Sequence, residues 1–590
     1  MLGYLPIVLF LSLGWFLRDP VSLLASAILV LYSLFVVVFH KDTKWARGNG
    51  QVLLFLLFSM YLISSFINGL SISEMFQGAY QRNFGLFFWL ALFIVYGFVS
   101  SGKVKISSFL ERGLPIVLVA GLTYGLAQRF DKDPFPWVNP YDAVQLTLGN
   151  PNFAGAFLGM LAVLPIAFAL KNTNIGFWVA GILVFGLTIF VALGTNSLQA
   201  IVVLALALII FALVYLGKNR NVAARSFRFL SALGGLIVLA LTPLMLFSKV
   251  GFLDGFREKF FYQGSIAQRL DYWRTGIEIF KDNLWFGVGP DQFQRYAALY
   301  RTKEQVVRDG AFVIPDKAHS VLIDALANGG IFAGILWITF VGFIFVKLIQ
   351  AARLELPSRV RLELAVLSAI WLGYVFQALI SPDQLVLAVI GFMSAGLIVH
   401  INRSQVKAVE KKSKLEFLFD DPWYLRTVFM AVLIFAGAVW GQAISADMAA
   451  KKVLNNENLT RESVLAAVNK WPAPKTTELI AVAVSQADAQ CDVADELADR
   501  LIELDGRSAQ GWYLKAICFN VNREFDKALS ASENALKFDP LNPTYLVAKA
   551  KLGIASGQKD SAQAALADIK ENYPDNPEIT PLETSISVMP

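Results

Sequence analysis

Long apolar segments recur through the first three quarters of the chain and constrain its fold more than any other feature. Each has about the 17 to 25 residues that a helix needs to cross a hydrocarbon core. Backbone polar groups find no water in lipid, so such segments fold as helices. We predict about thirteen spans, near residues 3–17, 20–39, 51–70, 84–100, 113–129, 153–170, 175–194, 198–216, 228–248, 319–347, 362–381, 384–402 and 426–446.

The composition supports an all-α, polytopic membrane protein and excludes an ordinary soluble enzyme. Of the 590 residues, 56% are hydrophobic and only 16% are charged. The character of the chain changes near residue 446, so we expect a membrane domain over 1–446 and a helix-rich, water-compatible domain over 447–590. The first apolar run lacks a basic n-region and a small-residue cleavage site, which indicates a retained span. The formal charge of +6 is explained by loop bias and gives no indication of nucleic-acid binding.

The distribution of Lys and Arg predicts the orientation in the membrane. Every second loop is basic, as at 41–47, 103–112, 171, 218–225, 353–361 and 403–414. The positive-inside rule then places the N-terminus in the cytoplasm. The long loop 249–318 and the domain 447–590 would lie outside the cytoplasmic membrane, which requires an odd number of spans.

A repeat of 34 residues runs through 471–577. Asp492, Asp526 and Asp560 are in phase, and Asp505 aligns with Asp539. Small residues at fixed helical positions and Pro/Asn turns between units resemble tetratricopeptide repeats, which form a helical solenoid. Two interpretations stay open: a support for the membrane domain, or a docking surface for a protein partner.

Both cysteines lie in this repeat region. Folding residues 491–503 back against 508–521 as antiparallel helices brings Cys491 near Cys518. A disulfide and a pair of buried thiols are both compatible with this placement.

The loop 249–318 contains an apolar stripe at helical spacing, formed by Ile266, Leu270, Trp273, Ile277 and Phe280, and then the turn "GVGP". We expect an amphipathic helix at the membrane surface with Arg269 beside its stripe. Arg269 is either a snorkelling arginine or part of an anion site, because guanidinium forks match phosphate geometry. Arg82, just before a span, has the same two interpretations.

Polar groups also gather where other spans begin. Asn152 lies in "GNPNFAGAFLG", a stretch suited to close helix packing, and Ser197 and Gln199 lie in "GTNSLQA". Polar groups at such depth usually face protein or water, so we predict that these three residues line a pocket. The acidic pair in "DKD" (131–133) has no supporting metal-binding motif, and we predict no metal site.

His319, in "IPDKAHSVLIDALANGGIF", is the one histidine of three that the predicted orientation places outside the membrane. A histidine at the start of a helix has either a structural or a catalytic role, and its position alone does not decide between them.

Five stretches occur in a fixed order: "GAYQRNFG", "GNPNFAGAFL", "QRLDYWRTGIEIFKDNLWFGVGPDQF", "AHSVLIDALANGGIFAGILW" and "FQALISPDQLVLAVIGFMSAGL". In this order, with a long external loop before the histidine-bearing helix, they resemble the O-antigen ligase/polymerase superfamily of bacterial envelope glycosyltransferases. A tetratricopeptide tail is found in one branch of that superfamily. The resemblance implies a C-type glycosyltransferase-like membrane fold without a nucleotide-sugar site.

The resemblance also implies the reaction. The donor would be an undecaprenyl-pyrophosphate-linked glycan, and the acceptor a hydroxyl group of a glycolipid, a glycan or a protein. Transfer would invert the anomeric carbon without metal or cofactor. Arg269 matches the arginine that engages the donor pyrophosphate, His319 matches the catalytic histidine, and Arg82 matches an external arginine of many members. One departure is that Ser197 is followed by Leu198 where many ligases have arginine.

The chemistry of these residues agrees with that implication. Pyrophosphate is a good leaving group whose growing charge needs cations, and Arg269 and Arg82 would supply them, with Arg274 or Arg295 in reserve. Neutral imidazole suits removal of the acceptor proton. The alternatives are a polymerase or a protein O-oligosaccharyltransferase of the same superfamily, and, from other classes, a lipid-linked glycan transporter or a non-catalytic scaffold.

Overall fold

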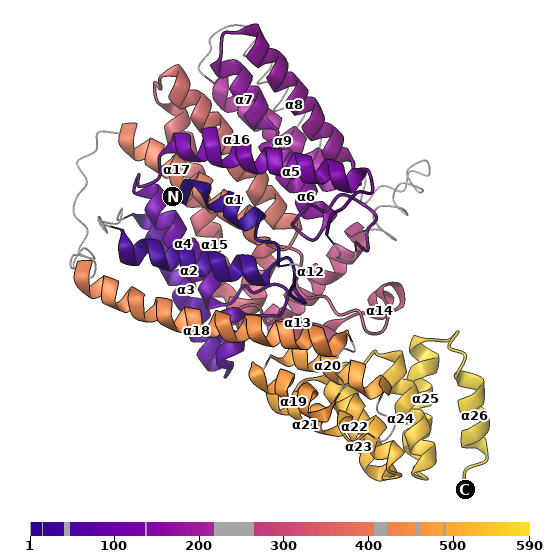
Figure 1. Ribbon diagram of the computed structural model, residues 1–590. Coiled ribbons are helices and arrows are strands. Elements are labelled where there is room, and N and C mark those ends of the chain that lie inside the picture. The colour runs from indigo at the N-terminus through magenta and orange to yellow at the C-terminus, as the bar shows by residue number, and fades with distance from the viewer. Residues whose placement is uncertain are drawn as a thin grey trace, which may run out of the picture.

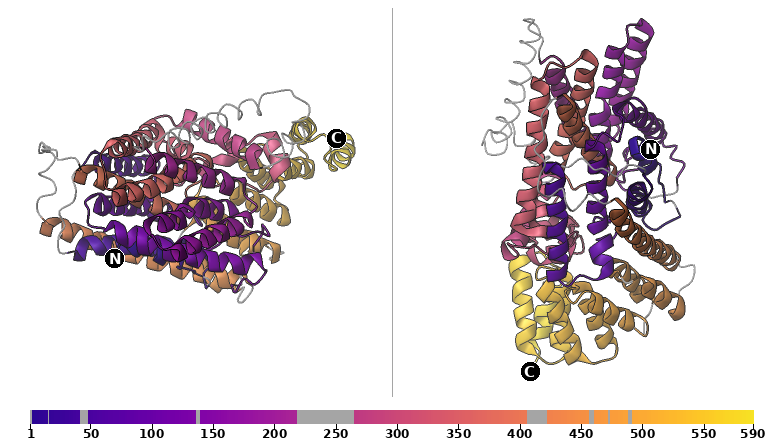
Figure 2. Two further views of the ribbon diagram at one scale, coloured as in Figure 1. Left: turned by 90° about the horizontal axis from the view of Figure 1, so that it is seen from above. Right: turned by 90° about the vertical axis from the view of Figure 1, so that its left-hand side faces the viewer.

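The computed structural model describes residues 2–14, 16–40, 48–135, 139–217, 265–405, 422–455, 460–471, 473–487 and 491–590. Every regular element within these ranges is a helix, which confirms the all-α prediction. The helices form a membrane-domain bundle and, beyond one end of it, a stack of shorter repeat helices (Figures 1 and 2).

Most predicted spans correspond to single helices or to continuous helix pairs. The helices of the bundle are α1 (Leu5–Phe10), α2 (Leu23–Phe39), α3 (Asn49–Ile67), α4 (Leu86–Ser100), α5 (Leu114–Arg129), α6 (Pro151–Leu161), α7 (Val163–Lys171), α8 (Ile175–Leu193), α9 (Leu198–Tyr215), α15 (Val321–Arg353), α16 (Ser358–Ile380), α17 (Leu385–Gln405) and α18 (Pro422–Leu454). Within the described residues, nine helical stretches are long and apolar enough to cross a membrane, and α2 and α4 are shorter apolar helices.

The count of thirteen spans is not confirmed. The predicted span 228–248 lies outside the described residues. The predicted span 3–17 is replaced by a 3-10 turn, Leu2–Tyr4, and the short helix α1. These nine residues extend about 14 Å, which is too short to cross the hydrocarbon core. Apolar composition alone therefore overestimated the length of this helix.

Close packing of small residues holds the centre of the bundle together. A Cβ on Gly155 of α6 would lie 2.7 Å from the Cβ of Ala200 on α9, and one on Gly159 would lie 2.9 Å from the backbone N of Leu204. Side chains at either position would push the two helices apart. This agrees with the packing role expected for "GNPNFAGAFLG".

Three of the predicted basic loops meet at one end of the bundle, which we call the basic end. Glu111, before α5, accepts from Lys171 at 2.7 Å and from Arg359 at 2.8 Å. The helices that lead away from these loops, α6–α7 and α15, begin at the opposite end, where Asn152 and His319 lie. Candidate site residues and basic loops therefore lie at opposite ends of the same helices.

A glycine turn and a broken helix shape the end where α15 begins. Helix α12 (Ser265–Asp282) confirms the predicted amphipathic helix, and Leu270 and Ile277 on its stripe are exposed. The following "GVGP" turn has Gly287 and Gly289 at positive φ. Its backbone pairs with α15 at a break at Gly330, where Val288 N donates to Ala327 O at 3.0 Å. The turn thus satisfies carbonyl groups that the break releases from the helix ladder.

Helix α18 joins the bundle to the repeat helices as one element of 33 residues, about 50 Å long. It continues through the expected domain boundary at 446/447 and ends at Leu454. Asp447 on α18 accepts from the Tyr80 hydroxyl at 2.6 Å and from Arg18 N at 2.5 Å. The end of α18 is therefore fixed to the same loops that carry Arg82.

The repeat domain consists of paired antiparallel helices. They are α19 (Arg461–Lys470), α20 (Pro474–Ala487), α21 (Ala494–Leu504), α22 (Ala509–Val521), α23 (Phe525–Phe538), α24 (Pro543–Ala555), α25 (Lys559–Asn572) and α26 (Ile579–Ser587). Cys491 and Cys518 form a disulfide with a Cα–Cα distance of 5.4 Å, which decides between the two states that the sequence left open.

Candidate active site

His319 lies in the turn before α15, packed against α12. Its ring meets the Tyr272 ring in a T-shaped contact with centroids 4.9 Å apart. Trp273 donates from Nε1 to the His319 carbonyl oxygen at 3.2 Å. The φ of His319 is 55°, in a region that non-glycine residues seldom adopt and that is enriched at functional sites. The surrounding contacts therefore hold His319 in a backbone conformation that is unfavourable for an isolated residue.

Arg82 reaches the same turn through an ion pair. Its Nε donates to Oδ2 of Asp316, three residues before His319, at 2.5 Å. Its guanidinium also lies 6.0 Å from the ring centroid of Phe153, the neighbour of the predicted pocket residue Asn152. Arg82 thus joins three loops that are far apart in the sequence.

Burial, helped by two nearby arginines, keeps the imidazole of His319 neutral at neutral pH. Burial lowers the pKa of His319 to about 4; Asp316 opposes this shift, and Arg82 and Arg269 add to it. Burial alone would raise the pKa of Asp316, but Arg82 outweighs burial and holds that pKa at about 2. Asp316 is therefore a poor proton acceptor, and His319 is left as the neutral base of the turn.

Arg269 faces the site from α12, and it has no acidic partner among the residues that the structure describes. Its Nη2 lies 3.5 Å from Oε1 of Gln199, at the limit of a hydrogen bond. Among the residues described, the buried Nε of Arg269 and the buried Nε2 of Gln199 have no hydrogen-bond partner. Burial lowers the pKa of Arg269, and no carboxylate in the described part of the chain compensates for this burial. Buried donors without acceptors are costly, so this arrangement favours an anion between them.

The remaining predicted pocket residues connect the starts of two helices. Ser197 donates from Oγ to Oδ1 of Asn152 at 2.6 Å, which joins the N-terminal residues of α9 and α6. Gln199, two residues further along in α9, is 4% exposed. Asn152, Ser197, Gln199, Arg269, Arg82 and His319 are thus linked through a short series of contacts.

The two reserve arginines are elsewhere. Arg274 is exposed on α12, about 140° around the helix from Arg269 by helical geometry. Arg295 donates to Glu74 at 3.1 Å and to Asp505 of the repeat domain at 2.7 Å. The expectation that Arg295 stands in reserve for the donor is therefore corrected, since two carboxylates already neutralise it.

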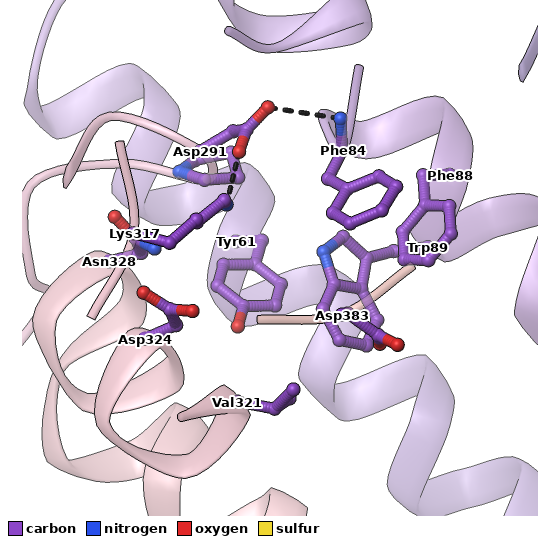
Figure 3. Close-up of a pocket in the computed structure, with 11 residues that line it drawn as sticks. Tyr61, Phe84, Phe88, Trp89, Asp291, Lys317, Val321, Asp324, Asn328 and Asp383 are labelled. Atoms are coloured by element: carbon purple, nitrogen blue, oxygen red, sulfur yellow. Dashed lines mark hydrogen bonds and ion pairs between the residues drawn. The ribbon is translucent and has the colours of Figure 1, made fainter. Parts of the chain in front are cut away.

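A second charged group lies beside the His319 turn, around a cavity of about 30 Å³ (Figure 3). Asp291 and Lys317 form an ion pair there, and both are almost fully buried, at 3% and 5% exposed. Asp291 Oδ2 also accepts from the backbone N of Ala79 at 2.7 Å and of Phe84 at 3.0 Å. One carboxylate thus fastens the loop of Arg82 to the loop of His319.

The sequence contained a signal for these supporting residues that our predictions did not use. Asp316 and Lys317 stand directly before His319, and Asp291 ends the "GVGPD" turn. Charges so close to a span must be paired when they are buried, which identifies them as structural or functional. Arg82, the partner of Asp316, and the backbone groups that Asp291 binds are more than 200 residues away in the chain, so these pairings were not readable.

Within the acidic pair at 131–133, Asp133 has a structural role. Asp133 accepts from the Tyr124 hydroxyl at 2.9 Å and from Gln128 at 2.9 Å, which caps the end of α5. Within the described ranges, no group of three His, Cys, Asp or Glu side chains is close enough to hold a metal ion.

Cationic and imidazole groups thus gather at one end of a helical membrane bundle, in Arg82, Arg269 and His319. Residues 182–338 match the O-antigen ligase family, and residues 522–586 match a tetratricopeptide repeat. Both matches confirm the resemblance read from the motifs. The first includes Ser197, Gln199, Arg269 and His319 and indicates glycosyltransferase-type activity of the ligase/polymerase superfamily. The search of curated proteins found no match.

Proposed function

We propose that the protein transfers a glycan from an undecaprenyl-pyrophosphate carrier to an acceptor hydroxyl, at the extracytoplasmic face of the bacterial cytoplasmic membrane. The observation that carries the proposal is Arg269, whose buried Nε has no acceptor among the described residues and which lies beside the unpaired Nε2 of Gln199. A pyrophosphate would accept hydrogen bonds from both groups. It would lie between α9 and α12, close to His319.

The arginines and His319 have different roles in the proposed reaction. The acceptor oxygen bonds to the anomeric carbon as the bond from that carbon to the phosphate oxygen breaks. The electron pair leaves with undecaprenyl pyrophosphate, whose growing charge Arg269 and Arg82 stabilise. The acceptor proton passes to the neutral imidazole of His319. A single displacement of this kind inverts the anomeric carbon, and the arginines supply the positive charge without a metal.

Donor binding would also strengthen His319 as a base. In the free site, burial lowers the pKa of His319 to about 4, and Arg82 and Arg269 contribute to the decrease. A bound pyrophosphate neutralises these arginines and brings negative charge near the imidazole. The pKa of His319 then rises toward the ordinary value for histidine, about 6.5, so His319 becomes an effective base when the donor is bound.

Two features support the extracytoplasmic location. The Cys491–Cys518 disulfide is typical of oxidising compartments, and it lies in the domain next to the site. The basic loops around Glu111 lie at the other end of the bundle, as the positive-inside rule requires of cytoplasmic loops.

The test is single-turnover transfer by the purified protein in EDTA, with an undecaprenyl-pyrophosphate glycan from its own host and membrane extract as acceptor source. We expect release of undecaprenyl pyrophosphate by the wild type. His319→Ala and Arg269→Ala are expected to lower the rate by about 100-fold or more.

Matched controls separate loss of chemistry from loss of structure. Arg274→Ala removes an exposed arginine from the same helix as Arg269, and His400→Ala removes a histidine from the far end of α17. Both are expected to keep wild-type rates. Full activity of the His319 and Arg269 variants would exclude their assigned roles. No release by the wild type with any acceptor would favour the transporter and scaffold alternatives.

A further inference from the structure

The repeat domain contacts a segment of the membrane domain that precedes the candidate active site in the chain. We call residues 293–313, which include α13 (Phe293–Ala297) and α14 (Lys303–Asp309), the docking segment. Nη2 of Arg301 in this segment lies 2.6 Å from each carboxylate oxygen of Asp539, at the end of α23. The two side chains are 0% and 1% exposed, so the pair is sealed inside the interface.

Arg301 also binds the backbone of its own segment. Its Nη1 donates to the carbonyl oxygens of Ala311 at 3.0 Å and of Val313 at 3.2 Å. Asn542 of the repeat domain donates from Nδ2 to the same Ala311 oxygen at 3.2 Å and to Asp539 at 3.0 Å. Three hydrogen bonds therefore fix the stretch 311–313: two come from Arg301, which Asp539 holds in place, and one comes directly from the repeat domain.

A second contact uses the same repeat position one unit earlier. Asp505 lies 34 residues before Asp539, and it accepts from Arg295 at 2.7 Å. Arg295 also donates to Glu74, in the short helix Ser73–Gln77 that precedes the loop of Arg82. The acidic positions of successive repeats thus bind arginines that are six residues apart in the docking segment.

The stretch 311–313 precedes His319 by only a few residues. Asp316, which pairs with Arg82, follows Val313 by three residues, and His319 follows it by six. Over such a distance an extended chain spans at most about 20 Å, so the stretch 311–313 lies close to the turn of His319. His319 also has a left-handed backbone conformation that its surroundings must enforce.

We propose that the repeat domain positions the catalytic histidine: Asp539 and Asn542, acting through Arg301 and the carbonyls of Ala311 and Val313, hold the turn of His319 in its working geometry. This inference rests on the proposed function for its kinetic part. Asp539, Asn542 and Arg301 are positioning residues, because none of them touches the site itself. The edge of the solenoid formed by Asp505 and Asp539 is an intramolecular interface.

The kinetic test compares variants on the repeat side. Asp539→Asn is expected to lower kcat about tenfold or more and to change the donor KM by less than about threefold, because the donor arginine Arg269 lies on α12, outside the docking segment. Asp539→Glu restores the charge and is expected to recover part of kcat. Lys515→Met is the matched control, since Lys515 pairs at 2.9 Å with Asp495 and Asp499 inside the repeat domain.

Hydrogen exchange tests the same inference without activity. Peptides covering 311–319 are expected to exchange faster in Asp539→Asn and in Asn542→Ala than in the wild type. Peptides of α16 and α17 are expected to stay unchanged in both variants. Lys515→Met is expected to leave 311–319 as in the wild type.

The outcomes separate the two proposals. If wild-type protein transfers no glycan, the proposed function fails, and exchange still decides whether the repeat domain holds 311–319. If Asp539→Asn does not fold, Asn542→Ala decides; it removes the donor to Ala311 and Asp539 and the N-cap of α24, and losing the cap lowers the folded-to-unfolded ratio only about fivefold, which is about 1 kcal/mol. Unchanged kcat and unchanged exchange in the folded variants overturn the inference, and so does an equal loss of kcat in Lys515→Met.

Discussion

Replacing Asp291 by asparagine is expected to destabilise the protein by about 3 to 5 kcal/mol, the usual cost of breaking a buried ion pair from one side. Asparagine keeps an oxygen that can accept from the backbone N of Ala79 and Phe84, so the hydrogen bonds of this loop largely survive. What disappears is the charge opposite Lys317, which is 5% exposed. The whole expected loss therefore comes from an uncompensated ammonium group.

The surroundings of Lys317 refine this magnitude. Burial acts to lower the pKa of Lys317, and Asp291 and then Asp324 outweigh it, so that the pKa is raised. Because Asp324 remains in the variant, part of the compensation is retained. We expect a loss near the lower limit, about 3 kcal/mol.

The assay is denaturant unfolding in one fixed detergent, with Lys317→Met and the double variant Asp291→Asn/Lys317→Met completing a cycle. The double variant has no buried charge to compensate and is expected to recover most of the loss. A loss below about 1 kcal/mol in Asp291→Asn, or a double variant no more stable than the single one, would refute this account of the pair.

The further predictions concern the site and the repeats. The acid limb of kcat/KM is expected near pH 4, because the free protein needs neutral His319 and the pKa of His319 is about 4. Activity is therefore present above this pH. An acid limb near pH 6.5 would contradict the assignment. Since the folded pKa lies below that of the unfolded chain, stability also falls as the pH is lowered from about 6.5 to 4. Asp316→Asn is expected to move the limb to lower pH in the same profile, because Asp316 raises the pKa of His319. Arg269→Lys keeps the charge and loses the fork, so kcat/KM is expected to fall about tenfold, and an unchanged value would exclude bidentate binding. Reduction of Cys491–Cys518, 27 residues apart, is expected to destabilise the repeat domain by about 3 kcal/mol in unfolding followed with and without reductant, and an unchanged midpoint would contradict this.

The helices, and the positions of the candidate site residues on them, could be predicted from the sequence because their signals are local. Apolar length predicts spans, and the stripe of α12 with the "GVGP" turn predicts an amphipathic helix that ends in a glycine turn. His319, Arg82 and Arg269 stood out as polar groups at the mouths of spans. Each of these signals lies within one segment, so no knowledge of packing was needed.

The supporting network could not be predicted, because its members come from distant loops. Asp291 contacts Ala79 and Phe84 across more than 200 residues, and only the folded bundle brings these loops together. The same limit applies to Arg295, whose partners Glu74 and Asp505 belong to different domains. The segment 3–17 failed for another reason: apolar residues predict contact with lipid or core, and they do not measure helix length.

The pairing of Asp505 and Asp539 with two arginines also limits how this protein can change in length. A unit inserted between the two aspartates would separate them by a second repeat, while Arg295 and Arg301 would stay six residues apart. One of the two ion pairs would then be lost. Units added after α25 would leave both pairs intact. Duplication of repeats is therefore tolerated on the far side of the solenoid and opposed on the side next to the membrane.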